Sequence, residues 1–200
     1  MNILALSPHT DDVEIKAGGT IARFIEEGHT VTMIAFSTGN SQTGANRSEF
    51  EAAMNALGVT QYELCDYKTR HFPETRQHIL DRLVALRARF WPDLVLIPCT
   101  TDRHQDHQAI TAEALRAFRE NVRILGYISP RSHTLPVGLN CFVQLEQRHL
   151  DAKLAAISCY QSQAGKPYLR AGFIRALAHV QGVQCGAEFA EGFEGIRWVI

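Results

Sequence analysis

A histidine and two aspartates directly follow the first apolar run of the chain, and this stretch constrains the fold more than any other. Ile3 to Leu6 is a short apolar run without helical flanks, which predicts a buried strand that ends before Pro8. The polar stretch His9-Thr-Asp-Asp12 comes next, and apolar residues with helical spacing begin beyond Gly18-Gly19. We therefore expect the polar stretch in a strand-to-helix loop. In open α/β sheets, loops at the carboxyl ends of the strands form the ligand crevice.

The two adjacent aspartates need an explanation beyond local structure. A loop aspartate usually caps a helix or closes a turn, and one of the pair could do so. The other carboxylate would then have no structural task. His9 and Asp12 are three residues apart and could bind one metal ion, with Asp11 free beside them to act as a base. Catalytic zinc sites typically use three protein ligands and leave a position for water, so a third ligand is expected elsewhere.

A second polar cluster follows the fourth predicted strand, Asp93 to Pro98. The loop after this strand ends in His104-Gln-Asp106-His107. Because parallel strands present their carboxyl ends at one edge of a sheet, this cluster should lie beside the first. A histidine pair three residues apart at a helix start places both rings on one side. Alone, the pair could equally be two solvated loop histidines. Together with the first cluster, it supplies the missing ligand and predicts a metal site.

Strand and helix patterns alternate along most of the chain. Apolar runs predict further strands at 30–36, 60–65 and 123–128, and helical spacing predicts helices at 47–57, 73–90 and 109–118. The less regular remainder predicts an edge strand at 137–145, helices at 148–160 and 168–180, and a last apolar run at 196–200. In the helix at 168–180, the residues expected to face the core are Phe173, Leu177 and Val180. This order predicts a single α/β domain, residues 1–200, with a Rossmann-like, mostly parallel sheet, helices on both faces and a small C-terminal α/β extension.

Composition excludes several classes of protein. The formal net charge of −1 offers no basic surface for nucleic acid and no polybasic patch for a membrane. No apolar run reaches the roughly eighteen residues that a transmembrane helix needs. The first residues form a strand rather than the basic and apolar regions of a secretory signal. The five cysteines are dispersed without a CxxC pair, which favours a reducing compartment, so we expect a cytoplasmic protein.

The two polar clusters together carry a family resemblance. Pro8-His9-x-Asp11-Asp12 with Gly18-Gly19-Thr20, and His104-x-Asp106-His107, resemble the motifs of the LmbE-like/PIG-L family of zinc-dependent N-acetylglucosaminyl de-N-acetylases. The resemblance spans most of the chain, and these motifs are specific as a set. The weaker matches are Ser37-Thr-Gly, the helix that starts at Arg47 and ends at Leu57-Gly58-Val59, and Tyr160-x-Ser162-Gln163.

The resemblance implies a role for each residue of the two clusters. The implied zinc ligands are His9, Asp12 and His107. Asp11 corresponds to the general base, which takes a proton from the zinc-bound water that attacks the amide. His104 corresponds to the histidine that acts as acid or stabilises the oxyanion, and Asp106 would orient His104. Fe²⁺ could replace Zn²⁺, because histidine and carboxylate ligands suit both ions.

Substrate contacts are predicted at three positions near the crevice. Asn46 and Arg47 follow the long polar loop after the second strand, and the matching arginine in the family contacts substrate. Arg70 follows the third strand. An ordinary exposed arginine at a helix start explains Arg47 about as well, and a plain surface loop explains Arg70 better.

Lys16 and the segment after residue 159 have more than one interpretation. Lys16 stands where many family members have glycine; it should face solvent, the default for lysine, or else reach an anionic group of the substrate. Tyr160, Gln161 and Gln163 could close the pocket from the C-terminal side. The histidines without partner spacing should be structural or exposed: His29, His78, His133, His149 and His179.

The resemblance implies a zinc-dependent hydrolase that removes an acetyl or similar acyl group from a small amino-sugar substrate. It also implies a homo-oligomer. One alternative is another mononuclear metal hydrolase, such as a phosphoesterase, although most such sites recruit a second ion and only one ligand triad is clear here. The other alternative is a non-catalytic sugar- or nucleotide-binding module, although the first loop lacks the G-x-G-x-x-G of dinucleotide-binding sheets.

Overall fold

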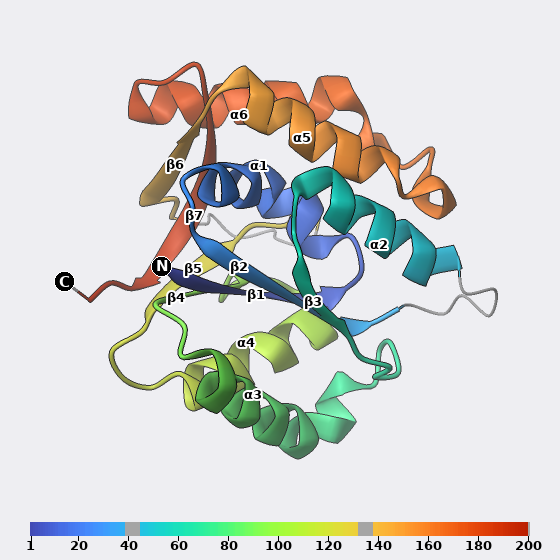
Figure 1. Cartoon of the computed structure of the whole chain (residues 1–200), viewed down its shortest axis with the longest axis vertical. Coiled ribbons are helices and arrows are strands. Elements are labelled where there is room, and N and C mark those ends of the chain that lie inside the picture. Colours follow the sequence, from blue (N-terminus) through green and yellow to red (C-terminus); the bar gives the residue numbers. More distant parts are fainter. Residues whose placement is uncertain (39–44, 132–137, 200) are drawn as a thin grey trace.

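The computed structural model of the protein describes residues 1–38, 45–131 and 138–199. Within these residues, seven strands form one sheet in the order β3-β2-β1-β4-β5-β7-β6 (Figure 1). The strands are β1 (Asn2–His9), β2 (Thr30–Ser37), β3 (Gln61–Leu64), β4 (Leu94–Pro98), β5 (Arg123–Tyr127), β6 (Cys141–Leu145) and β7 (Phe189–Arg197). Paired neighbours among β1 to β5 run parallel, whereas β7 is antiparallel to both β5 and β6. The predicted mostly parallel sheet is confirmed. Four predicted features lie outside the described residues: 39–44 of the polar loop, His133, Val137 of the edge strand and Ile200.

Six α-helices accompany the sheet in the described part of the chain. They are α1 (Asp12–Glu26), α2 (Ala45–Leu57), α3 (Arg76–Phe90), α4 (Gln105–Ala117), α5 (Gln147–Ser158) and α6 (Ala171–Cys185). Figure 1 shows α3 and α4 on one face of the sheet, and α1 and α2 on the other with α5 packed against them. α6 packs against β7 and β6. None of the described helices is long and apolar enough to cross a membrane.

β1 lies in the interior of the sheet and contributes to a core on each face. Ile3 and Ala5 pack into one buried cluster with residues of α1 and α2. Leu4 and Leu6 pack into a second cluster with residues of α3 and α4. Because both faces are covered, the strand is a continuous apolar run in the sequence rather than an alternating one. The carboxyl end of β1 is therefore held between two packed layers, and so are the polar residues that follow it.

α1 begins at Asp12, earlier than predicted, and the glycine pair lies inside the helix. A Cβ atom on Gly19 would lie 2.5 Å from Cδ1 of Leu145 and 3.3 Å from Oε1 of Glu191. Glycine therefore lets the C-terminal strands approach this side of the helix closely. The glycine pair made the helix start look later than it is, because glycine inside a helix usually costs stability.

β7 begins at Phe189, although the sequence predicts an apolar run only from residue 196. Glu191 obscured the strand, because a carboxylate is rarely buried unless it is paired. Its buried side chain accepts hydrogen bonds from the backbone N–H groups of Gly19 at 3.1 Å and Thr20 at 2.6 Å. Nζ of Lys153 donates to the same carboxylate at 2.6 Å. The paired and hydrogen-bonded charge is tolerated in the interior, and it ties β7 to α1 and α5.

α6 buries a different face from the one predicted. Phe173 and Val180, two of the three residues expected inside, are 40% and 55% exposed. The buried face consists of Ile174, Ala178 and Gly182. A Cβ atom on Gly182 would lie 2.6 Å from the backbone oxygen of Glu188, so glycine is required where α6 meets the start of β7. The helix face with small residues makes this close approach, and the larger apolar residues are exposed to solvent.

We expect Gly182→Ala to lower the free energy of unfolding by about 1–3 kcal/mol, the usual cost of overpacking against a backbone that cannot move away. Gly172→Ala in the same helix is the matched control, because a Cβ atom there meets nothing within 4 Å. The control should be neutral or stabilising by up to about 1 kcal/mol. Urea unfolding of both variants measures the difference, and equal effects would contradict the proposed close approach.

Candidate active site

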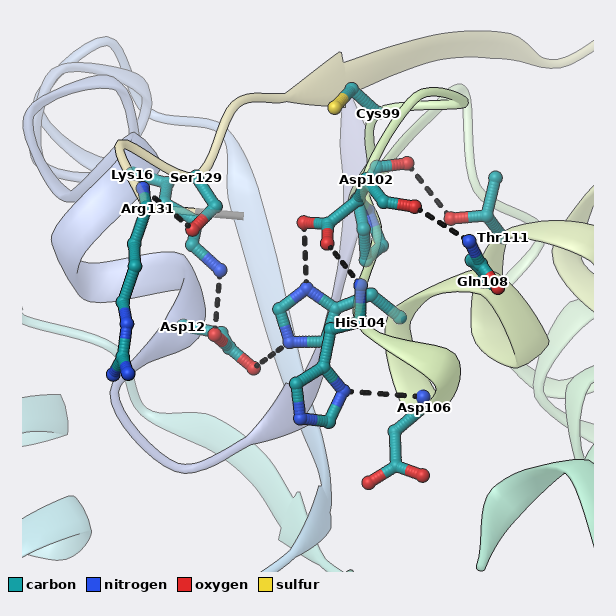
Figure 2. A network of polar contacts seen from close by, with 12 residues as sticks. Asp12, Lys16, Cys99, Asp102, His104, Asp106, Gln108, Thr111, Ser129 and Arg131 are labelled. Atoms are coloured by element: carbon teal, nitrogen blue, oxygen red, sulfur yellow. Dashed lines mark hydrogen bonds and ion pairs between the residues drawn. The ribbon is translucent and has the colours of Figure 1, made fainter. Parts of the chain in front are cut away.

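The two polar clusters meet at the carboxyl edge of the sheet. His9 ends β1 and Asp12 opens α1, while His104 is the N-cap of α4 and His107 lies in its first turn. β1 and β4 pair directly, so the clusters that follow them are neighbours. Both clusters line one cleft with a volume of about 680 Å³. In the view of Figure 2, the ring of His104 lies between Asp12 of the first cluster and Asp106 of the second.

Three potential ligand atoms converge in this cleft. Oδ2 of Asp12 lies 3.2 Å from Nδ1 of His9 and 3.2 Å from Nε2 of His107. All three atoms lie within 4.8 Å of one another. A tetrahedral ion with ligand bonds of about 2 Å separates its donor atoms by about 3.3 Å. The spacing therefore fits an ion such as Zn²⁺, which accepts two imidazole nitrogens and one carboxylate oxygen.

Carboxylates on the far side of the two rings orient both histidines. Nε2 of His9 lies 2.8 Å from Oδ2 of Asp106, and Nδ1 of His107 lies 2.8 Å from Oδ2 of Asp102. If these two nitrogens donate, the other nitrogen of each ring is left as an acceptor for an ion. Sequence reasoning missed Asp102. A carboxylate five residues before a candidate ligand histidine, near a helix start, is the signal that could have found it.

A second group of potential ligands, His9, His104 and Asp106, also comes together in the described residues. The carboxylate of Asp106 already contacts His9 and accepts hydrogen bonds from the backbone N–H groups of Arg70 at 2.6 Å and Phe72 at 3.2 Å. These contacts occupy both of its oxygens, which makes Asp106 a poor ligand. The group that contains Asp12 fits an ion better.

The carboxylate of Asp106 does not orient His104, contrary to the prediction. At the start of α4 that carboxylate turns toward His9, and only the backbone N–H of Asp106 reaches His104, donating to Nδ1 at 3.2 Å. A neutral His104 that accepts at Nδ1 carries its hydrogen on Nε2. Burial, followed by the charges of His107 and His9, lowers the pKa of His104. The ring is therefore neutral near pH 7 and offers one N–H donor.

The neighbouring carboxylates control the protonation of the two candidate ligand histidines. Burial lowers the pKa of His9, but Asp106 and Asp12 outweigh burial and raise it to about 9. Burial likewise lowers the pKa of His107, and Asp12 and Asp102 outweigh it, so that pKa is raised too. Without an ion, His9 therefore carries a proton on each ring nitrogen at neutral pH, and His107 is protonated more readily than a free imidazole. An ion must displace the proton on a coordinating nitrogen when it binds.

Asp11 is not part of the ligand group, and it has an unusual backbone conformation. Its φ is 91°, in a left-handed region that few non-glycine residues adopt. It occupies the N-cap position of α1, but its side chain makes no capping hydrogen bond, so the capping alternative does not hold for this residue. Burial, and then the charge of Asp12, raises the pKa of Asp11 to about 7. A carboxyl group with this pKa in the cleft can exchange a proton near neutral pH.

Lys16 is buried and lines the cleft, so the expectation of a solvated lysine is wrong. It lies one helical turn after Asp12, and its Nζ donates to Oδ1 of Asp12 at 2.6 Å. The ammonium also lies 5.3 Å from the ring centre of Tyr127. Burial raises the pKa of Asp12, but the charges of His107 and Lys16 outweigh burial and hold that pKa well below its usual value.

A buried hydrogen-bonded pair between Tyr160 and Glu14 of α1 was also not predicted from the sequence. The hydroxyl of Tyr160 donates to Oε1 of Glu14, and both side chains are buried. Oε2 of Glu14 has no hydrogen-bond partner among the described residues, and burial raises the pKa of this group to about 7. Tyr160 thus packs against α1 rather than closing the cleft. Gln163 does line the cleft, whereas Gln161 is exposed and donates to a backbone carbonyl.

The three predicted substrate contacts lie in different places. Asn46 and Arg70 line the cleft. Arg47 is not among the described residues that line it; its exposed guanidinium lies 3.8 Å from Glu51 on the next turn of α2. The roles of these residues in substrate binding stay predictions.

Comparison with known proteins identifies the family. The family model PIG-L, described as GlcNAc-PI de-N-acetylase, matches residues 4–118. The chain belongs to this family. A protein of Escherichia coli K12 named "Uncharacterized deacetylase YaiS" is 31% identical over 172 residues, which cover 80% of this chain and 90% of that protein. Membership of a deacetylase family supports an amidohydrolase, and the family resemblance seen in the sequence is confirmed.

Two further comparisons cover nearly the whole chain. The diacetylchitobiose deacetylase of Thermococcus kodakarensis is 26% identical over 227 aligned positions, with 98% of this chain and 82% of that protein covered. The crystal structure of the conserved protein TT1542 from Thermus thermophilus superposes with a TM-score of 0.81 at 23% identity. It covers 100% of this chain and 97% of that one, which shows that the two share a fold.

We expect metal binding at pH 7 to release at least about one proton, the one that His9 holds because its pKa is about 9. Calorimetric titration of the metal-free protein with Zn²⁺ in buffers of different ionisation enthalpy measures this number. Affinity should rise with pH up to about 9, because the proton on His9 competes with the ion below its pKa. Asp106→Asn should reduce the release, since His9 loses its main carboxylate partner. Asp66→Asn, an exposed aspartate outside the cleft lining, is the control. A binding enthalpy independent of the buffer would contradict this expectation.

Proposed function

We propose that the protein is a zinc-dependent amidohydrolase that removes an N-acetyl or similar acyl group from a small amino-sugar substrate. One observation carries the proposal: the donor group of His9, Asp12 and His107 shares its cleft with Asp11, a carboxylate that no capping bond occupies. His9, Asp12 and His107 would hold the ion. Fe²⁺ suits the same donors and is the alternative metal.

The family and the relatives support the choice of substrate. The family is described by its GlcNAc-PI de-N-acetylases, and the Thermococcus relative is a diacetylchitobiose deacetylase. The cleft volume of about 680 Å³ lies within the range of about 300–1,000 Å³ that is usual for small-molecule sites. Polar side chains in its lining, including Asn46, Thr69 and Gln163, could bind the hydroxyl groups of a sugar.

Asp11 transfers protons in the proposed reaction, and His104 stabilises negative charge. When bound, the ion supplies a water of lowered pKa and polarises the amide carbonyl. Asp11 takes one proton from the water as the water oxygen adds to the carbonyl carbon. The Nε2–H of His104 donates to the oxygen that becomes negative in the tetrahedral intermediate. The C–N bond then breaks as the proton held by Asp11 passes to the amine nitrogen. The second water proton is lost from the acetic acid that forms and is taken up by the amine, so acetate and the protonated amine leave.

We expect Asp11→Asn to lower kcat by about 10²- to 10⁴-fold, the usual contribution of a general base. Its zinc content should not change, because Asp11 is not in the ligand group. Asp66→Asn is the control for the loss of one acidic charge and should keep full activity. Acetate release and metal analysis on the same preparations measure both quantities. Wild-type activity in zinc-loaded Asp11→Asn would reject the mechanism.

A substrate panel tests the reaction itself. N-Acetylglucosamine, its nucleotide, inositol and glycoside forms, and an N-acetylated aminocyclitol antibiotic are incubated with the zinc-loaded protein. We expect acetate release from one member or more, abolished in His107→Ala because that change removes a ligand. A protein that binds no zinc and releases no acetate from any member would overturn the proposed function.

A further inference from the structure

The cleft carries more positive side chains than the proposed reaction uses. Besides Lys16, which is bonded to Asp12, its lining includes Arg70, Arg131 and Lys166. No ion pair joins any of these last three side chains to a carboxylate within residues 1–38, 45–131 and 138–199. Three cations therefore border the site without an anionic partner in the described protein.

Elsewhere in the fold, many arginine side chains do have an acceptor. Ion pairs with carboxylates hold Arg23, Arg47, Arg76, Arg82, Arg89, Arg116, Arg148 and Arg175. Backbone carbonyls accept from Arg87, Arg119, Arg123 and Arg197. Arg170 resembles the cleft cations in having no carboxylate partner among the described residues, but it does not line the cleft. It provides a natural control.

Arg70, Arg131 and Lys166 reach the cleft from separate connections. Arg70 follows β3, Arg131 follows β5, and Lys166 stands in the segment between α5 and α6. In the view of Figure 2, the guanidinium of Arg131 lies on the opposite side of Asp12 from His104. Lys166 lines the same cleft as the candidate ligands His9, Asp12 and His107.

The proposed reaction involves no negatively charged group that would pair with these cations. Asp12 is shared among Lys16, His9 and His107, and a bound divalent ion would add further positive charge. The amide that is hydrolysed is neutral, and so is an N-acetylated amino sugar that carries no further substituent. Guanidinium and ammonium groups bind oxyanions well, and a guanidinium can hold a phosphate or carboxylate through two parallel hydrogen bonds.

We infer that the cleft binds an N-acylated amino sugar that carries an oxyanion, a phosphate or a carboxylate, and that Arg131 and Lys166 bind this group with Arg70. The inference rests on the proposed function for the identity of the sugar. The ion and Asp11 act on the amide, and the cations select and orient the rest of the substrate. Neutral amino sugars are then poor substrates of the same site.

Kinetics with matched substrates test the inference. The panel is N-acetylglucosamine, its 1-phosphate and 6-phosphate, and N-acetylmuramic acid, which carries a carboxylate. We expect kcat/KM for the best anionic member to exceed that for N-acetylglucosamine by about tenfold or more. A charge-assisted hydrogen bond is strong enough to produce a difference of this size. The member preferred identifies phosphate or carboxylate as the natural group.

Two variants connect that preference to the named side chains. Arg131→Gln and Lys166→Gln should each raise KM for the anionic substrate by about tenfold and change kcat/KM for N-acetylglucosamine by less than about twofold. Arg170→Gln, which also removes one positive charge, should change neither value. An anionic preference that persists in both variants, or its absence in the wild type, would overturn the inference and leave deacetylation intact.

A binding measurement separates this inference from the proposed function. Calorimetry compares glucosamine with glucosamine 6-phosphate on the zinc-loaded wild type and both variants, and inorganic phosphate measures direct binding to the ion. If no substrate is turned over but the sugar phosphate binds about tenfold more tightly than glucosamine, and the variants lose this, the anion site stands and the deacetylase proposal fails. Equal binding of the two sugars together with no turnover overturns the inference.

Discussion

The site depends on how Asp12 divides its two carboxylate oxygens. Oδ1 accepts a hydrogen bond from Lys16, while Oδ2 accepts the backbone N–H of His9 at 2.9 Å and faces the rings of His9 and His107. A carboxylate buried this deeply is stable only with such partners. Because Lys16 neutralises part of the charge of Asp12, an ion bound there would keep more of its own charge for water and carbonyl. In the proposed mechanism the lysine would therefore act through Asp12 rather than on the reacting atoms.

Asp12 can hold this position because α1 is fixed on the side away from the cleft. The carboxylate of Glu191 binds backbone N–H groups of Gly19 and Thr20, and Lys153 pairs with it. These buried polar contacts join the C-terminal strands and α5 to the helix that carries the site. The antiparallel end of the sheet is therefore not an accessory to the parallel part. The contacts of Glu191 hold α1 close to the C-terminal strands. The absence of a side chain at Gly19 allows this close packing.

The parts of the fold with strong periodicity could be predicted from the sequence, and so could the two polar clusters, because strand ends and residue types define both. The prediction failed where tertiary contacts outweighed local pattern. Glu191 is polar but buried, Gly182 is small but faces the sheet, and Val180 is apolar but exposed. Lys16 is buried because Asp12 lies one turn before it. The sequence shows that spacing, but the default for lysine is solvent, so only the packed structure decides between the two.

The residues proposed to perform the reaction and those proposed to select its substrate occupy different kinds of position in the fold. Histidine and aspartate at the ends of adjacent parallel strands are placed by the sheet itself, so the sequence can reveal them. Arg70, Arg131 and Lys166 come from three connections between elements, which follow no periodic pattern, and only the folded structure places them in one cleft. Family membership therefore bears on the amide chemistry, while the charge around Arg131 and Lys166 bears on the substrate. Two proteins can share the first and differ in the second, because connections change without disturbing the packed sheet.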